Sequence, residues 1–202
     1  YLMLIRCECL LYAAEIGFRE SVISSKDRNL LLKSYLNNME IILEEFSDEP
    51  RVLREVLWYS IQVLSWLGMK EKALEYLKRL QCCFHEFASM YQEEIPSLSI
   101  LYKDLLTLAS SWKYIILASQ LLKKRNWSGA LSLFIWALGV LRGSEQYRWR
   151  DMELLLESSI LLCQGFIERD RKAEKLKAAR EKLEELDRRI SEISPPWIRE
   201  SN

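Results

Sequence analysis

The stretch from Asn126 to Ala137, Asn-Trp-Ser-Gly-Ala-Leu-Ser-Leu-Phe-Ile-Trp-Ala, is the most informative part of this chain. Trp127 is followed three, seven and ten residues later by Ala130, Phe134 and Ala137. On a helix these steps place small and large residues along one stripe, so a neighbouring helix can pack closely against the two alanines. The pattern predicts the second helix of a helix-turn-helix pair, docked onto the helix before it.

Helix start and stop signals extend this prediction along the whole chain. Only 6 Gly and 4 Pro occur in 202 residues, and no segment alternates between apolar and polar residues as a half-buried strand does. The sequence therefore predicts an all-α protein of about eight helices joined by short turns, which makes successive helices antiparallel neighbours. From the capping residues, the first expected helix covers about 1–18, and the second starts after the capping residues 24–27 and ends near 46. The others cover about 50–67, 70–92, 96–124, 127–141, 145–165 and a last segment that ends near 193.

Two of these predicted hairpins resemble the tetratricopeptide repeat family. Trp127, Ala130, Phe134 and Ala137 match the second helix of a repeat, and the positions of the first helix fall on Tyr114, Leu117, Ala118 and Leu121. The earlier hairpin matches less well: Gly68 stands at the turn glycine, Ala73, Leu77 and Leu80 at core positions, and Ile61 where a small residue is usual. The interval between Ala73 and Ala130 is longer than one family repeat and shorter than two.

The resemblance covers about residues 50–142 and describes a degenerate repeat array. It implies a right-handed stack of helix hairpins, an α-solenoid, whose usual function is to bind other proteins. We expect a single helical domain over residues 1–202, which is a piece of a longer protein. Hairpins are expected over 1–168, followed by a charged amphipathic helix over 169–194.

The last predicted helix has two interpretations. An apolar seam recurs at steps of three and four residues and includes Leu176, Ala179, Leu183, Leu186, Ile190 and Ile193. The favoured interpretation is a cap whose apolar stripe covers the last hairpin, because stacked arrays need a polar outer end and a seam this short is marginal by itself. The alternative is a coiled-coil arm that dimerises or recruits a partner.

Residue types that support catalysis or metal binding are scarce. His85 is the only histidine, and the sequence has no phosphate-binding glycine loop. Cys82 lies one turn before His85, but no neighbouring feature completes a nucleophilic site. We therefore expect no enzyme activity, no cofactor, no metal and no small-molecule substrate.

Cysteine usage and hydropathy bear on the compartment. Five cysteines lie in apolar helical stretches without metal-site or disulfide spacing, which is typical of a reducing compartment. The apolar runs are interrupted by charged residues, so a membrane-spanning segment is not expected. These features favour an intracellular protein, either cytoplasmic or nuclear.

What remains is an interaction surface. Trp and Tyr are preferred interface anchors, and the first helices of a hairpin stack line its concave face. The candidate partner-binding residues are Trp58, Tyr59, Trp66, Trp112, Tyr114, Trp149, Arg148 and Arg150. The sequence thus favours a scaffold or adapter subunit of a multi-protein complex that holds a peptide or helical segment of another protein.

Two alternatives to the scaffold stay open. Residues 1–100 contain 11 basic and 15 acidic residues, and residues 101–202 contain 18 and 14, although the whole chain has a net charge of zero. The first alternative is a nucleic-acid-associated subunit that uses this positive half, and the second is oligomerisation through the last helix.

Overall fold

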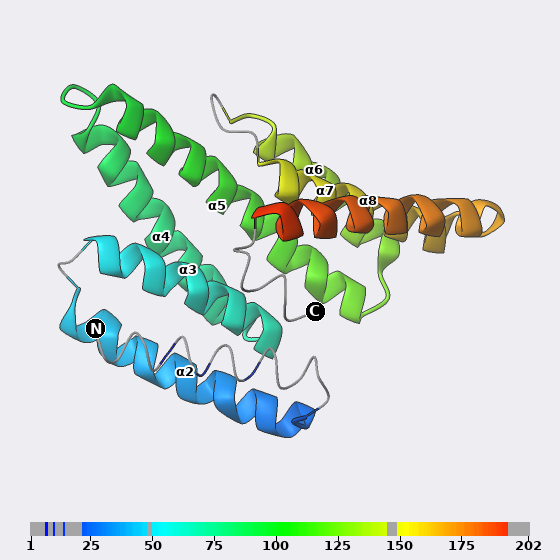
Figure 1. The fold of residues 1–202 in the computed structure, drawn as a ribbon, viewed down its shortest axis with the longest axis horizontal. Coiled ribbons are helices and arrows are strands. Elements are labelled where there is room, and N and C mark those ends of the chain that lie inside the picture. Colours follow the sequence, from blue (N-terminus) through cyan, green and yellow to red (C-terminus); the bar gives the residue numbers. More distant parts are fainter. Residues whose placement is uncertain are drawn as a thin grey trace. The chain divides into compact units, whose positions relative to one another are not determined.

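The computed structural model describes Cys7, Leu10, Ala14 and residues 22–47, 50–144 and 149–193, and these residues are helical or lie in short turns, without a strand (Figure 1). With the labels of Figure 1, the helices are α2 (Ser25–Glu45), α3 (Pro50–Leu67), α4 (Lys70–Met90), α5 (Pro96–Lys123), α6 (Trp127–Leu141), α7 (Arg150–Ile167), the short 3-10 helix η1 (Arg169–Arg171) and α8 (Lys172–Ile193). The all-α prediction is confirmed for the described residues. The stacking of hairpins into a solenoid stays a prediction.

Most of the predicted helix boundaries agree with the structure. The Ser24 side chain caps α2 by accepting a hydrogen bond from the backbone N–H of Asp27, and the Asn126 side chain caps α6 through Gly129. The start of α7 differs from the prediction. The Ser144 hydroxyl accepts a hydrogen bond from the Trp149 indole N–H at 3.0 Å, and the helix begins only at Arg150.

The first predicted helix, over about residues 1–18, lies outside the described residues except for Cys7, Leu10 and Ala14, each of which is helical.

The chain divides into two compact units, Tyr1–Cys83 and Phe84–Asn202, with the boundary inside α4. In the first unit α2 packs against α3. One face of α2 is buried because its apolar residues recur at helical spacing; these are Leu32, Tyr35, Leu36, Met39, Ile42 and Leu43. On α3 the Trp66 ring lies 5.6 Å from the guanidinium of Arg28 on α2, which adds a cation–π contact.

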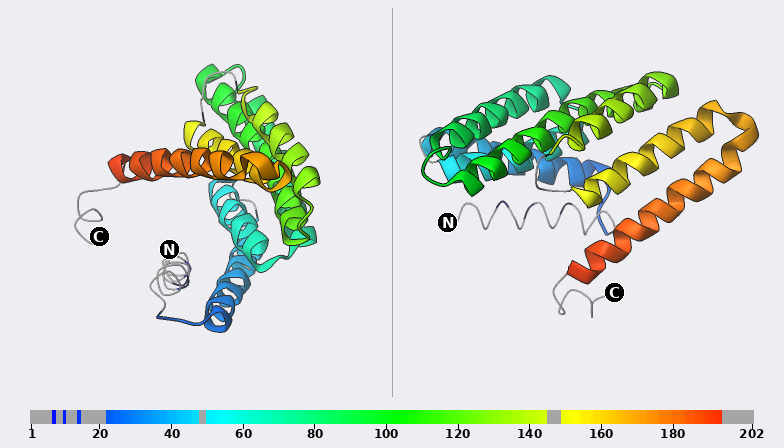
Figure 2. Two further views of the ribbon diagram at one scale, coloured as in Figure 1. Left: turned by 90° about the vertical axis from the view of Figure 1, so that its right-hand side faces the viewer. Right: turned by 90° about the horizontal axis from the view of Figure 1, so that it is seen from above.

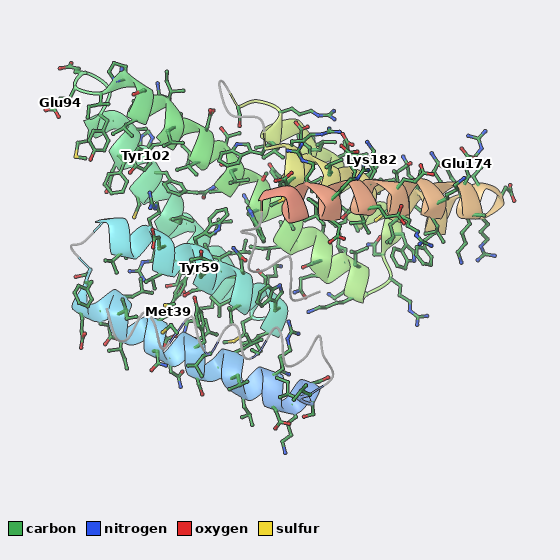
Figure 3. All side chains as sticks on the ribbon, in the orientation of Figure 1. Met39, Tyr59, Glu94, Tyr102, Glu174 and Lys182 are labelled. Carbon is green, nitrogen blue, oxygen red and sulfur yellow. The ribbon has the colours of Figure 1, made fainter. Side chains whose placement is uncertain are left out.

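In the second unit the end of α4 packs on the start of α5 through aromatic rings. Figure 3 shows Tyr102 on the side of α5 that faces α4. Its ring stacks on Tyr91 at a centroid distance of 5.9 Å and lies 5.0 Å from Phe87. The Ser99 hydroxyl donates a hydrogen bond to the Ala88 carbonyl at 2.6 Å. These contacts join the two helices across the turn that contains Glu94, which Figure 3 places at the far end of α4.

From α5 onward each helix of this unit packs against the next one: α5 against α6, α6 against α7, and α7 against α8. Figure 2 shows α7 and α8 as a hairpin with the turn at η1. One side of α6 is buried: Ala130 and Ala137 have no exposed surface, and Phe134 is 5% exposed. The alanines let the neighbouring helices approach α6 closely.

The turns that end α3 and α5 share one backbone motif. Residue Gly68 has φ of 78° and Arg125 has φ of 54°. After each of them the next N–H bonds back five residues, from Met69 to the carbonyl of Leu64 and from Asn126 to that of Leu121. This is the Schellman C-cap, in which the left-handed residue is usually glycine. The sequence interval between the two turns equals the interval between Ala73 and Ala130, the core alanines of the helices α4 and α6 that follow them.

Charged residues of α8 contact α7, in addition to the apolar seam. Ala179 is 4% exposed, but Leu183 of the predicted seam is 44% exposed, and the side chains of Ile190 and Ile193 lie outside the described residues. Beside the apolar contacts, three ion pairs connect the helices: Lys182–Glu157 at 2.8 Å, Arg150–Glu185 at 3.1 Å and Arg189–Asp151 at 2.6 Å. The charged face of α8 therefore does not point entirely to solvent.

Helix α5 bears on the membrane prediction. Among the described residues it is the one helix long and apolar enough to cross a membrane by length and composition, with a mean hydropathy of 1.3 over a stretch that is 28% buried. Core helices of soluble proteins meet the same criteria of length and composition, but they are mostly buried; α5 packs on α6. The sequence prediction counted Lys113 as an interruption of the apolar run, although it is the one charged residue in 105–122.

Candidate interaction surface

Helix α6 presents an exposed face without any charged residue. Its 15 residues, Trp-Ser-Gly-Ala-Leu-Ser-Leu-Phe-Ile-Trp-Ala-Leu-Gly-Val-Leu, include no Asp, Glu, Lys or Arg. Because Ala130, Phe134, Ala137 and Leu141 point into the core, the opposite side of the helix must point outward. The exposed residues of this side are Ser128, Ser132, Ile135, Trp136 and Gly139, and we call them the α6 face.

Two large apolar side chains dominate the α6 face. Trp136 is 64% exposed and Ile135 is 52% exposed. Between them run small residues, since Ser132 and Gly139 are two helical turns apart on the same side. A Cβ atom added to Gly139 would meet nothing within 4 Å, so the space above it is open. The face is therefore an apolar strip with bulky margins and a low centre.

Trp136 and Ile135 are not among the candidate binding residues predicted from the sequence. The exposure of these two residues could have been predicted from the stretch between Asn126 and Ala137. A helix without charge normally lies in a fully buried position, but the stripe of Ala130, Phe134 and Ala137 buries only one side. The residues on the other side are then both apolar and exposed.

The predicted partner-binding aromatics are distributed over both units. On α3, Tyr59 is 45% exposed and Trp66 is 41% exposed, whereas Trp58 is half-buried. On α5, Trp112 and Tyr114 are half-buried, and so is Trp149 before α7. Tyr59 and Trp66 thus present accessible rings in the first unit, although Trp66 already contacts Arg28.

Of the two arginines predicted to bind a partner, the structure describes Arg150 alone. Arg148 lies outside the described residues. Arg150 is in an ion-pair network at the α7–α8 contact, where its guanidinium lies 3.1 Å from Glu185 and 3.4 Å from Glu153. Its charge is therefore used within the unit.

Glu157 lies at the centre of this network. Its carboxylate is 2.9 Å from Arg142, 2.8 Å from Lys182 and 4.0 Å from Arg150. Burial by itself raises the pKa of Glu157, but the hydrogen bond from Lys182 and the three positive charges together lower it below its ordinary value. The carboxylate thus stays ionised at neutral pH and connects α6, α7 and α8.

The predicted repeat-packing residues lie in the interior or at helix contacts. Ala73, Ala118, Ala130 and Ala137 are fully buried. The Trp127 ring stacks on Phe166 of α7, with centroids 4.1 Å apart and planes at 8°. Gly68 forms the turn after α3 with its positive φ. Side chains that fix helix packing in this way are not accessible to a partner.

A cluster of cations stands at one end of the α6 face. Lys123, Lys124 and Arg125, the α5–α6 turn, are all exposed. Among the described residues, none of the three has an ion-pair partner. At the other end of α6, Arg142 is paired with Glu157 but keeps 54% of its side chain exposed.

The thiols and the histidine do not form a reactive group in the described part of the chain. Cys82 and His85 are both exposed on α4, and no hydrogen bond joins them. Cys163 is buried in α7, and this burial raises the pKa of its thiol, which keeps it protonated and unreactive at neutral pH. Within the described residues, no three His, Cys, Asp or Glu side chains lie close enough to hold a metal ion.

Comparison with known proteins gave no match for this chain, either to a family model, to a curated protein or to a solved structure.

Proposed function

We propose that this protein is a non-catalytic interaction scaffold, an intracellular adapter that holds a segment of another protein on its helices. The observation that carries the proposal is the α6 face, where Trp136 and Ile135 stand exposed on a helix without charge. Removing large apolar groups from water is favourable, and exposed strips of this kind characterise protein contact sites. Tyr59 and Trp66 add exposed rings on α3.

The tetratricopeptide-like arrangement belongs to this proposal. The alanines at core positions and the shared turn motif at Gly68 and Arg125 support a repeated hairpin, whose period in this chain is longer than that of the family. A stack of such hairpins forms a stiff support on which exposed side chains are presented in fixed positions. Because such a support is stiff, its binding surface loses less conformational entropy when a partner associates with it.

Cross-linking in native cells tests the scaffold. We expect cross-links from the full-length chain to a defined partner, concentrated near α6 and reduced when Trp136 is replaced by Ala. Trp136→Ala leaves folding intact because the side chain is largely exposed. A monodisperse chain that forms no specific cross-link in its native cells would contradict the scaffold function.

Nucleic-acid binding is the second candidate, and the exposed Lys123, Lys124 and Arg125 favour it. In the described part of the chain, only these three adjacent cations are without an ion pair near α6, because Arg142 and Arg150 are paired with carboxylates of the unit. Salt separates the two functions. Affinity for RNA or DNA falls steeply as salt rises, whereas binding through Trp136 and Ile135 falls little.

A further inference from the structure

We infer that the α6 face binds one amphipathic helix of another protein, with aliphatic residues along its centre and acidic residues at both of its ends. The inference rests on the scaffold function proposed above and specifies its site and the chemistry of its partner. It is drawn from the shape of the α6 face, its lack of charge and the cations that border it.

The shape of the face fits a helix. Ser132 and Gly139 form a low line between Ile135 and Trp136, and the space over Gly139 is open. A partner helix can place its bulky side chains over this line, as ridges of one helix fit grooves of another. An amphipathic helix presents such side chains at steps of three and four residues, which is the usual form of helix-in-groove recognition.

The charges at the two ends of α6 indicate which partner helix would bind the α6 face. Cations border both ends of α6. Lys123, Lys124 and Arg125 stand before it, and Arg142 after it keeps 54% of its side chain exposed although it is also paired with Glu157. The face between them is neutral. A partner with Asp or Glu beyond its apolar centre would place negative charges opposite both ends. Complementary charges at the rim of an interface speed encounter and select the partner.

The same charges disfavour a second copy of this chain on the α6 face. If two α6 helices met in parallel, the Lys123–Arg125 cluster would face its own copy. In an antiparallel arrangement it would approach Arg142 of the other copy. Like charges meet in either case, and like charges in an interface are unfavourable.

Synthetic helical peptides test the inference directly. We would use three peptides of about 15 residues, the length of α6. All share one leucine stripe, and they end in Glu, in Lys or in neutral residues. Fluorescence polarisation with the full chain should give the Glu-ended peptide a Kd lower than that of the Lys-ended peptide by about tenfold or more.

Three variants and one control locate the site. Trp136→Ala should raise the Kd of the Glu-ended peptide by about tenfold or more. Gly139→Leu should abolish binding by filling the low centre, while the melting temperature stays equal or rises, because the position is open and helical. The double variant Lys123→Glu with Lys124→Glu should remove most of the preference for the Glu-ended peptide over the Lys-ended one. Tyr59→Ala, which removes an accessible ring from α3, should change nothing.

Several results would overturn the inference. These are unchanged affinity in Gly139→Leu, a preference of the natural chain for Lys ends, and a dimer in sedimentation that Gly139→Leu dissociates. Binding to phosphatidylserine vesicles through Trp136 without peptide binding would assign the face to membranes instead. If the peptides fail while native cross-links place a partner elsewhere, such as near Tyr59 and Trp66, the scaffold function stands and only this inference falls.

Discussion

At the residue scale, Arg125 occupies a backbone position that usually belongs to glycine. Its φ of 54° lies in the left-handed region, where the Cβ atom of an L-residue crowds the backbone. The same motif after α3 has Gly68 in this place. Arg125 is therefore retained at a cost in stability, and it stands in the cation cluster that borders the α6 face.

Exchanging the two residue types tests this cost. Arg125→Gly should raise the free energy of unfolding by about 0.5–1 kcal/mol, since the relief of strain exceeds the added chain entropy of glycine. Gly68→Ala should lower it by about 1 kcal/mol for the opposite reason. Urea denaturation measures both changes. A destabilised Arg125→Gly variant would show that the arginine side chain makes stabilising contacts.

Two small residues of α6 should respond in opposite ways to enlargement. Ala130 is fully buried, so Ala130→Leu should overpack the helix contacts and lower the free energy of unfolding by about 1–3 kcal/mol. Gly139 lies on the open side of the same helix, so Gly139→Ala should raise it by up to about 1 kcal/mol. Thermal denaturation measures both variants, and equal effects of the two would contradict the assigned orientation of α6.

At the element scale, α7 and α8 associate through charge as well as through apolar contacts. Glu157 of α7 forms ion pairs with Arg142, which follows α6, with Arg150 of α7 and with Lys182 of α8. The sequence suggested a strictly apolar seam for α8, but Leu183 is 44% exposed, and Lys182 and Arg189 reach α7. The helix is thus turned so that Lys182 and Arg189 form ion pairs with Glu157 and Asp151 of α7.

The lowered pKa of Glu157 makes this contact sensitive to acid. The folded chain holds the carboxyl below its ordinary pKa of 4.5, so ionisation contributes stability above that value. This contribution should disappear as the pH falls from 4.5 through the folded pKa. Hydrogen exchange of the α7 and α8 amides between neutral and acid pH measures the effect. Glu157→Gln should reduce stability at neutral pH and flatten the pH dependence, and an unchanged profile in this variant would assign it to other carboxyls.

At the scale of the whole molecule, charge is balanced. The chain has 29 basic and 29 acidic residues, and its isoelectric point is about 6.8. Proteins without net charge repel each other least, so at low salt the solubility should pass through a minimum near pH 6.8. Precipitation by polyethylene glycol over a pH series measures this. A solubility that changes in one direction only across neutral pH would contradict the expectation.

In the described part of the chain, sequence signals alone were enough to predict most of the helices and most of their ends. Local signals act here, because the Ser24 and Asn126 side chains cap the helices that follow them and Gly68 ends α3 within its own turn. The same signals did not give the start of α7, which begins at Arg150, and the Ser144 hydroxyl accepts a hydrogen bond from the Trp149 indole N–H. Capping depends on neighbours within a few residues, so sequence spacing is enough to predict most of it.

Only the tertiary structure decided which apolar residues stay exposed. The spacing of Trp127, Ala130, Phe134 and Ala137 identified the buried stripe of α6, but it did not show whether another helix covers the opposite side, which carries Trp136. Trp127 stacks on Phe166 and Trp136 is 64% exposed, because α5 and α7 cover one side of α6 and leave the other open. Burial depends on which helices meet in space, and that is a property of residues distant in the sequence.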